Sequence, residues 1–305
     1  MNKNTLNHKI DFAALISVTM ANPNGDPLDG NRPRIDYEDF GEISDVCIKR
    51  KIRNRMMDLK YDVFVQSDDK NEDGCESLKA RAEKYLPEIK NKKNQKMTLE
   101  EKEAYVAEAC KKYIDIRSFG QVFAISKTEK KNNSEDSEES GSDSGVSISA
   151  RGPVTIHQAR SVSPVDIVSF QITKSVKGSS NESRSDTMGM KHFVRYGLYV
   201  LKGSINVQLA EKTEFTTEDA DVIKECLRTL FMNDASSARP DGSMEVVKLY
   251  WWEHNCKEGQ YSSAKVHRLL EVKQKNTSDM PKSIDDFEIT LNSLDGLHCE
   301  EIAGY

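Results

Sequence analysis

The sequence lacks the short motifs that mark the common classes of enzyme. It contains no G-x-x-x-x-G-K-S/T phosphate loop, no G-x-G-x-x-G fingerprint, no G-x-S-x-G nucleophile elbow and no H-E-x-x-H pair. The six cysteines are scattered, without a C-x-x-C pair or a histidine at zinc-finger spacing, which argues against a zinc knuckle and a disulfide framework. The six histidines are isolated from one another along the chain. We therefore expect a protein that is not an enzyme, with no catalytic residue, no metal and no cofactor.

Long apolar runs are also missing. The apolar stretch 12–18 near the N-terminus is too short for a membrane span, and Lys9 and Asp11 precede it, which is wrong for a signal peptide. We expect a soluble, cytoplasmic protein that binds no membrane. Its 305 residues are enough for about two domain-sized units.

The sequence has little positive charge overall, with a formal net charge of −6, which at first argues against nucleic acid. The charges are unevenly placed, however. Residues 132–145 carry five acids and no base, whereas residues 49–55 carry five bases in seven positions. A local basic stripe is the electrostatic feature that nucleic-acid binding requires.

The first 60 residues predict a strand, a special loop and a basic helix. Residues 10–20 are apolar and β-branched, as in a buried strand, and residues 21–34 hold three Pro, two Gly and three Asn, as in a loop. Ser44 is a suitable N-cap for a helix over 45–59, with Ile48, Ile52, Met56 and Leu59 on one buried face. Lys49, Arg50, Lys51, Arg53 and Arg55 are predicted to lie mostly off that face.

The rest of the chain mixes helices with strands. Residues 62–114 are rich in Glu and Lys, with helices over 77–85 and 99–113, and predict an inserted helical subdomain. A helix capped by Thr216 or Thr217 is expected to run to about Asn233. The strands are predicted at 114–125, 146–159, 165–174, 191–207, 244–252, 266–272 and 287–291. The polar tract 127–145 is expected to be disordered. The pattern predicts an α+β fold of the ferredoxin-like kind.

The basic helix is the best candidate functional element. A solvated face is the common explanation of such a run, but solvated helices usually alternate Glu with Lys, and this run carries one sign only. Arg32 and Arg34 on the preceding Gly-rich loop extend the basic stripe. The loop and the helix together therefore fit a groove that holds a phosphate backbone. The loop carboxylates Asp26, Asp29 and Asp36 are interpreted mainly as turn-shaping residues, although one of them could position a metal.

The same residues carry a resemblance to a known family. The chain resembles the Cascade backbone subunit of type I CRISPR systems, nearest to the subtype I-C form (Csd/Csh family, RAMP superfamily). The matching motifs are Asn22-Pro23-Asn24-Gly25-Asp26-Pro27, Arg34-Ile35-Asp36, Ser44 to Asn54, Asp115 to Gly120, Arg151-Gly152-Pro153-Val154, Ala159-Arg160-Ser161, Met188 to Val194 and Tyr196 to Tyr199. Little is recognisable after about residue 210.

The resemblance implies a modified RRM-like palm, an inserted helical finger and a thumb hairpin. The palm would comprise residues 1–61, 115–126, 151–172 and 191–305, the finger 62–114, a disordered acidic loop 127–150, and the thumb tip 173–190. The implied partners are CRISPR guide RNA, target DNA, further copies of the chain in a filament, and other Cascade subunits (the guide-end cap and the large and small subunits). The implied RNA-binding residues are Asn22, Asn24, Arg32, Lys49, Arg50, Arg53, Arg117, Arg160, Lys174, Met188 as an apolar wedge, and Lys191.

Two alternatives stay open. One is a metal-dependent ribonuclease that cuts target RNA with Asp26, Asp29 or Asp36, as type III relatives of the family do. The other is an RRM-like adaptor, which would need exposed aromatic residues on its sheet. Trp251 and Trp252 are the candidates for that role, although adjacent tryptophans are more often core or interface residues.

Overall fold

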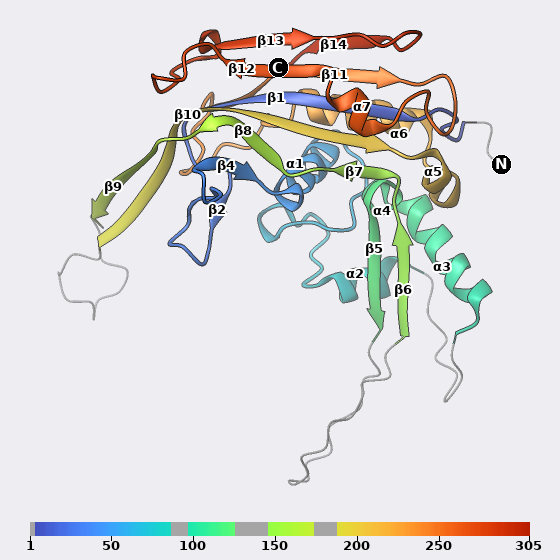
Figure 1. Ribbon diagram of the computed structural model, residues 1–305. Helices are drawn as coiled ribbons and strands as arrows, with labels where there is room; N and C mark the ends of the chain where they lie inside the picture. The colour runs from blue at the N-terminus through green and yellow to red at the C-terminus, as the bar shows by residue number, and fades with distance from the viewer. Residues whose placement is uncertain (1–3, 87–96, 126–145, 174–187) are drawn as a thin grey trace, which may run out of the picture.

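A large antiparallel sheet forms the centre of the molecule (Figure 1). The structure is a computed structural model, and it describes residues 4–86, 97–125, 146–173 and 188–305. Within these residues the large sheet has eight strands. From one edge to the other they are β14 (Cys299–Ala303), β11 (Met244–Glu253), β1 (Ile10–Ala21), β10 (Met188–Ile205), β8 (Ala159–Pro164) and β4 (Phe40–Ile43), while β7 (Val154–Ile156) and β9 (Ile167–Thr173) also pair with β10. The predicted α+β class is confirmed.

Strand β1 lies in the middle of the sheet and serves two cores, one on each face. Its residues alternate in direction, so Phe12 and Ala14 enter the first core while Ala13 and Leu15 enter the second. The neighbouring strand β11 divides in the same way. Trp251 stacks on Phe12 in the first core, with ring centroids 5.6 Å apart, and Trp252 lies in the second. Because both tryptophans are buried, neither offers the exposed ring that the adaptor interpretation requires.

Helices cover the first face of the sheet. They are α1 (Asp45–Asp58), α5 (Val207–Thr213) and α6 (Thr217–Arg228). The predicted N-caps Ser44 and Thr216 are confirmed, because their hydroxyls accept the N–H groups of Cys47 and Asp219. Helix α1 buries Ile48, Ile52 and Met56 as predicted, whereas Leu59 is the C-cap residue and is 38% exposed.

A small β layer covers the second face. It consists of α7 (Ser263–His267), β12 (Leu270–Gln274), the short helix η2 (Ile284–Asp286) and β13 (Phe287–Leu291). Strands β12 and β13 form their own antiparallel pair, and Leu270 and Phe287 pack against Tyr196 and Trp252 of the large sheet.

A third, separate core lies below the sheet in Figure 1. It is built by α2 (Leu78–Tyr85), α3 (Leu99–Lys112), α4 (Ile114–Phe119), β5 (Gly120–Ile125) and β6 (Val146–Arg151), and the short helix η1 (Asp68–Lys70) precedes α2 without burying a residue. Phe64 lies at its centre, with its ring edge against Tyr113 and Phe123. The β5–β6 hairpin shares this core with the helices, through Phe123 and Ile148.

Strand β10 continues beyond the sheet and forms a two-stranded ribbon with β9, visible on the left of Figure 1. The pairing runs from Val194 opposite Ile167 to Met188 opposite Thr173. The predicted thumb tip 173–190 falls mostly on residues 174–187, which lie outside the described residues, and so does Lys174. We refer to β9 with residues 188–194 of β10 as the β9–β10 ribbon.

Several predicted elements differ from the structure. The expected strand 114–125 begins as the helix α4, because Ile114 and Ile116 face two different cores, and Gly120 then redirects the chain. Residues 146–150 belong to β6, which agrees with the predicted strand 146–159 and not with the boundary that placed them in the disordered loop 127–150. The expected strand 266–272 is the end of α7 followed by β12, and α6 ends at Arg228 instead of near Asn233. Strand β14 was not predicted. The acidic tract 127–145, which was expected to be disordered, lies outside the described residues.

No helix in the described ranges combines the length and the apolar character that a membrane crossing requires.

Candidate nucleic-acid interface

The loop between β1 and α1 is fixed by its own asparagines. The Asn24 side-chain oxygen accepts both the N–H and the hydroxyl of Ser44, at 2.9 and 2.8 Å, and so ties the loop to the start of the helix. The buried Asn22 amide donates to the carbonyl oxygen of Asn31 at 2.7 Å. Within this loop, β2 (Gly25–Asp26) and β3 (Arg32–Pro33) form a short hairpin. Both predicted RNA-contacting asparagines therefore have a structural role in shaping the loop.

Two of the loop carboxylates also shape turns. Asp26 accepts the N–H of Leu28 at 3.0 Å and pairs with Arg34 at 3.4 Å. Asp36 accepts the N–H groups of Glu38 and Phe40 with one oxygen and Arg160 with the other. Desolvation alone would raise the pKa of Asp36, but these hydrogen bonds outweigh it and hold the pKa below its ordinary value of 3.8. The interpretation of Asp26 and Asp36 as turn-shaping residues is confirmed.

Asp29, the third candidate, is mostly exposed and faces Arg32 at 3.8 Å. Arg32 itself, a predicted RNA contact, is 39% exposed at the side chain. This pair is therefore long and solvated, and it contributes little to stability.

The basic helix keeps three of its five bases off the buried face, as mostly predicted, and turns the other two inward. Lys51 and Arg55 are buried, because the C-terminal third of the chain supplies polar partners on that side. The Lys51 ammonium pairs with Asp234, and Arg55 donates to Asp58 at 2.8 Å and to the Thr229 hydroxyl at 3.1 Å. Desolvation lowers the pKa of Lys51 below 10.5, although the charge of Asp234 opposes this.

The other three bases of α1 differ in how freely they reach solvent. Lys49 pairs with Asp45 one turn earlier, at 2.9 Å, and its side chain is 25% exposed. Arg50 donates to the carbonyl oxygen of Val65 at 2.7 Å. Arg53 is more enclosed, because it pairs with the fully buried Asp115 at 2.8 Å and lies over the Phe119 ring.

Arg117 on α4, also a predicted RNA contact, forms a two-pronged pair with Asp219 of α6, at 2.8 and 2.7 Å, and donates to the carbonyl oxygen of Cys110. Burial alone would lower the pKa of Arg117, but the hydrogen bonds and the charge of Asp219 outweigh it and raise the pKa. Arg53 and Arg117 therefore both join the third core to the helices under the sheet. Nothing in their local sequence indicates these structural roles.

Arg160 and Met188 are predicted contacts with exposed side chains, whereas Lys191 is half-buried. Arg160 on β8 is 47% exposed, stacks on the Phe40 ring at 3.8 Å, and pairs with Asp36 at 2.7 Å. Lys191 lies halfway along the β9–β10 ribbon, opposite Phe170, and its ammonium donates to the carbonyl oxygen of Ser237 at 3.4 Å. Met188, the predicted wedge, is 60% exposed on the same ribbon.

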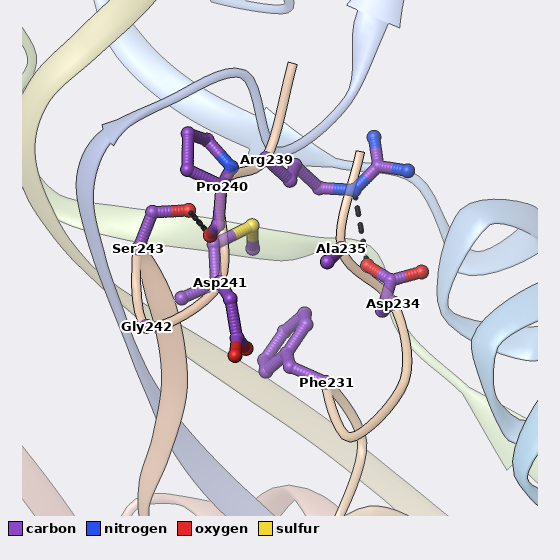
Figure 2. Close-up of a pocket in the computed structure, with 9 residues that line it drawn as sticks. Phe231, Asp234, Ala235, Arg239, Pro240, Asp241, Gly242 and Ser243 are labelled. Carbon is purple, nitrogen blue, oxygen red and sulfur yellow. Dashed lines mark hydrogen bonds and ion pairs between the residues drawn. The ribbon is translucent and has the colours of Figure 1, made fainter. Parts of the chain in front are cut away.

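The structure adds a segment that the sequence did not point to. Residues 234–243 form a loop in front of β1, and its carbonyl oxygen at Ala238 accepts the N–H of Asn22 at 2.8 Å. Figure 2 shows Asp234 and Arg239 of this loop facing each other beside the ring of Phe231, around a small pocket. The Arg239 Nε donates to Asp234 at 3.0 Å. The residues Pro240-Asp241-Gly242 are a local sequence signal for a turn. No local signal indicates that Asp234 of this loop pairs with Lys51 of α1.

The loop, the basic helix and the ribbon therefore meet at one end of the sheet. With this geometry established, comparison with known proteins is decisive. The family model described as CRISPR-associated protein Cas7 matches residues 8–292. The chain belongs to the Cas7 family. The predicted family is confirmed at this level, as a CRISPR-associated protein.

Individual relatives of this Cas7-family chain are distant. A CRISPR-associated protein Cas7 from Haloferax volcanii is 24% identical over 284 residues, which cover 90% of the chain and 77% of the relative. A chain of a solved CRISPR RNA-guided surveillance complex in a pre-nicking state is similar with a TM-score of 0.45 and 15% identity, covering 80% of this chain and 78% of that one. A second such complex gives a TM-score of 0.40 and 14% identity, covering 80% and 68%.

Proposed function

We propose that this Cas7-family protein is a guide-RNA-binding backbone subunit of a type I surveillance complex, of subtype I-C. Copies of the chain oligomerise along CRISPR RNA, and the assembled filament supports pairing of the guide with target DNA. The further partners are a guide-end cap and the large and small Cascade subunits. In this assignment the large sheet with its covering helices is the palm, residues 62–114 are the finger, and the β9–β10 ribbon leads into the thumb.

The observation that carries this proposal is the β9–β10 ribbon. Phe170 and Ile172 are 44% and 42% exposed, and Met188 and Met190 are 60% and 53% exposed. Cross-strand partners lie on the same side of a ribbon, so the register puts the two methionines on one face and Phe170 with Ile172 on the other. Apolar side chains on both faces favour a ribbon that is covered from two sides in the working assembly.

The cations on β3, α1, β8 and the ribbon support nucleic acid as one of the two covers. Five cations have exposed or half-exposed side chains: Arg32, Lys49, Arg50, Arg160 and Lys191. The proposed RNA-binding set consists of these five together with Asn22, Asn24, Arg53, Arg117 and Lys174. Contacts of this kind hold a phosphate backbone without reading its bases. Sequence recognition then belongs to base pairing between guide and target. Met188 is the proposed wedge between neighbouring bases.

We assign no catalytic step to this subunit. The carboxylates of Asp26 and Asp36 are engaged by backbone N–H groups and by arginines, which leaves a turn-shaping role as the simpler explanation. Incubation of the assembled complex with complementary RNA and Mg²⁺ checks this point. We expect intact RNA, and regularly spaced cuts that disappear in Asp26→Ala, Asp29→Ala or Asp36→Ala would establish the ribonuclease alternative instead.

The test of the backbone function measures assembly on a guide. The full chain is mixed with a guide-length RNA and its partner subunits, and the particle mass is read by native mass spectrometry. We expect assemblies longer than a dimer, and the double variant Met188→Ser with Met190→Ser should stop at shorter ones. Met280→Ser is the matched control, because Met280 is 51% exposed and belongs to the segment between β12 and η2, which is not part of the ribbon. A wild-type chain that stays monomeric under these conditions refutes the proposal.

A further inference from the structure

The 234–243 loop is held firmly against the proposed RNA-binding face. Its backbone is anchored at both ends of the turn, because Asn22 donates to Ala238 and Thr19 donates to Ser243, each at 2.8 Å. Its carbonyl oxygen at Ser237 accepts a hydrogen bond from the Lys191 ammonium of the ribbon. The loop therefore lies where β1 pairs for the last time with β10, at Ala21 and Val194, and where the ribbon leaves the sheet.

Positive charge from three distant segments gathers at this position. Lys51 comes from α1, Arg34 from the end of the β2–β3 hairpin and Arg239 from the loop. All three are close enough to act on the Cys47 thiol of α1, where burial raises the pKa and the three charges oppose the increase. Asp234 offsets one charge of the Lys51–Arg239 pair, and Asp26 offsets Arg34.

Arg239 is the residue of the Lys51–Arg239 pair that reaches solvent. Lys51 is only 4% exposed at its side chain and directs its ammonium at Asp234, so it cannot approach a ligand. The Arg239 side chain is 28% exposed and binds Asp234 through Nε. Its two terminal amino groups make no hydrogen bond within the ranges that the structure describes, and Figure 2 shows them directed away from the pocket.

We propose that the 234–243 loop is a wall of the guide groove in which the terminal amino groups of Arg239 bind a phosphodiester of the RNA backbone. Asp234 and Lys51 are positioning residues, since Asp234 accepts the Nε edge of the guanidinium and the Lys51 ammonium holds Asp234 in place, which leaves the other edge for the phosphate. A guanidinium suits this arrangement because its planar set of donors can engage two anions on different edges. The inference rests on the proposed guide-RNA function and gives the C-terminal third of the chain a part in it.

The experiment measures RNA binding by the full-length chain. A labelled single-stranded RNA of guide length is titrated by fluorescence anisotropy at several KCl concentrations, for wild type, Arg239→Ala, Arg239→Gln and Arg228→Ala. Arg228 on α6 is the matched control, because it is 31% exposed and its Nε donates to Glu225 at 2.8 Å. Melting temperatures are recorded for all four proteins. If Arg239→Ala melts early, Arg239→Gln, which keeps most of the side-chain volume, replaces it in the comparison.

We expect Arg239→Ala and Arg239→Gln to weaken RNA binding by about tenfold, as removal of a charge-assisted hydrogen bond does. The slope of log K against log salt should fall by about 0.7, because one phosphate of a single strand is no longer neutralised by the protein. Arg228→Ala should change neither quantity.

The outcomes separate this inference from the proposed function. If wild type binds RNA while Arg239→Gln behaves like Arg228→Ala, the loop is not part of the groove and the guide-binding function stands. A weaker affinity with an unchanged salt slope also overturns the inference, since it would indicate that the shape of the groove has changed while the number of neutralised phosphates has not. If wild type itself binds no RNA, the proposed function fails first.

Discussion

Removal of the Asp115 carboxylate should uncouple the third core from the sheet. Asp115 is completely buried, and three donors converge on it: Arg53 Nε at 2.8 Å, Phe64 N–H at 2.7 Å and Val65 N–H at 3.1 Å. The arginine belongs to α1, the two N–H groups belong to the segment that enters the third core, and the aspartate begins α4. One side chain therefore joins three elements.

The expected cost of Asp115→Ala follows from what it leaves behind. An orphaned buried donor costs about 1–3 kcal/mol, and breaking a buried ion pair from one side costs about 3–5 kcal/mol. These effects overlap, so we expect a loss of about 5 kcal/mol in the free energy of unfolding. Asp115→Asn keeps one oxygen for the N–H groups and loses the charge, so about half of that loss is expected.

Urea unfolding followed by circular dichroism measures these losses, and a thermal melt should fall by about 10 °C for Asp115→Ala. Asp166→Ala is the control. Asp166 receives Arg195 Nε at 2.7 Å, nearly the same geometry, but the side chains are 40% and 59% exposed. An exposed pair of this kind contributes at most about 1 kcal/mol. If Asp115→Ala and Asp166→Ala lose the same free energy, burial is not what gives the Asp115 cluster its strength, and the reasoning is wrong.

Three further predictions concern other parts of the molecule. Burial lowers the pKa of His267 in the folded protein below its ordinary value of 6.5. The unfolded chain therefore binds more protons than the folded protein as the pH falls below 6.5. The stability that His267 contributes above pH 6.5 should be lost as the pH falls through the pKa of the folded state. Urea unfolding across this range should show that His267→Gln removes this dependence, and an unchanged slope would rule out His267 as its source. Gly120→Ala should lower the free energy of unfolding by about 1–3 kcal/mol, because φ is +80° and a Cβ would collide with the carbonyl oxygen of Ala150; a melt like that of wild type would contradict this. Arg160→Ala should weaken RNA binding severalfold in an anisotropy titration while leaving the melting temperature unchanged, since its side chain is 47% exposed; equal affinity would remove it from the proposed RNA-binding set.

Local signals in the sequence predicted the elements that local physics decides. The run 10–20 indicated a buried strand, and Ser44 and Thr216 were correct N-caps, because an N-cap is decided within three residues. Residues 114–119 were misassigned because the β-branched and apolar residues that suggested a strand instead bridge two cores as a short helix. Tertiary packing overrides propensity in such a segment.

The candidate site was predictable only in outline. Its loop and basic helix were visible in the sequence, but the inward direction of Lys51 depends on Asp234, which is 183 positions away. Arg239 was invisible for the same reason, since a lone arginine beside a turn has no local mark of function. Periodicity gives the apolar face of a helix, and it does not say which bases a distant carboxylate will draw inward.

The ribbon also supplies a chemical test of the proposed assembly. Met188 and Met190 are exposed thioethers, and peroxide converts such groups to sulfoxides at a rate that follows their accessibility. Met280, with 51% exposure, supplies an internal reference on another part of the surface. In a chain with an uncovered ribbon the three methionines should oxidise at similar rates, whereas a covered ribbon should shield the first two alone. Oxidation of this pair would in turn make the ribbon polar, so damage by peroxide and failure to assemble should go together.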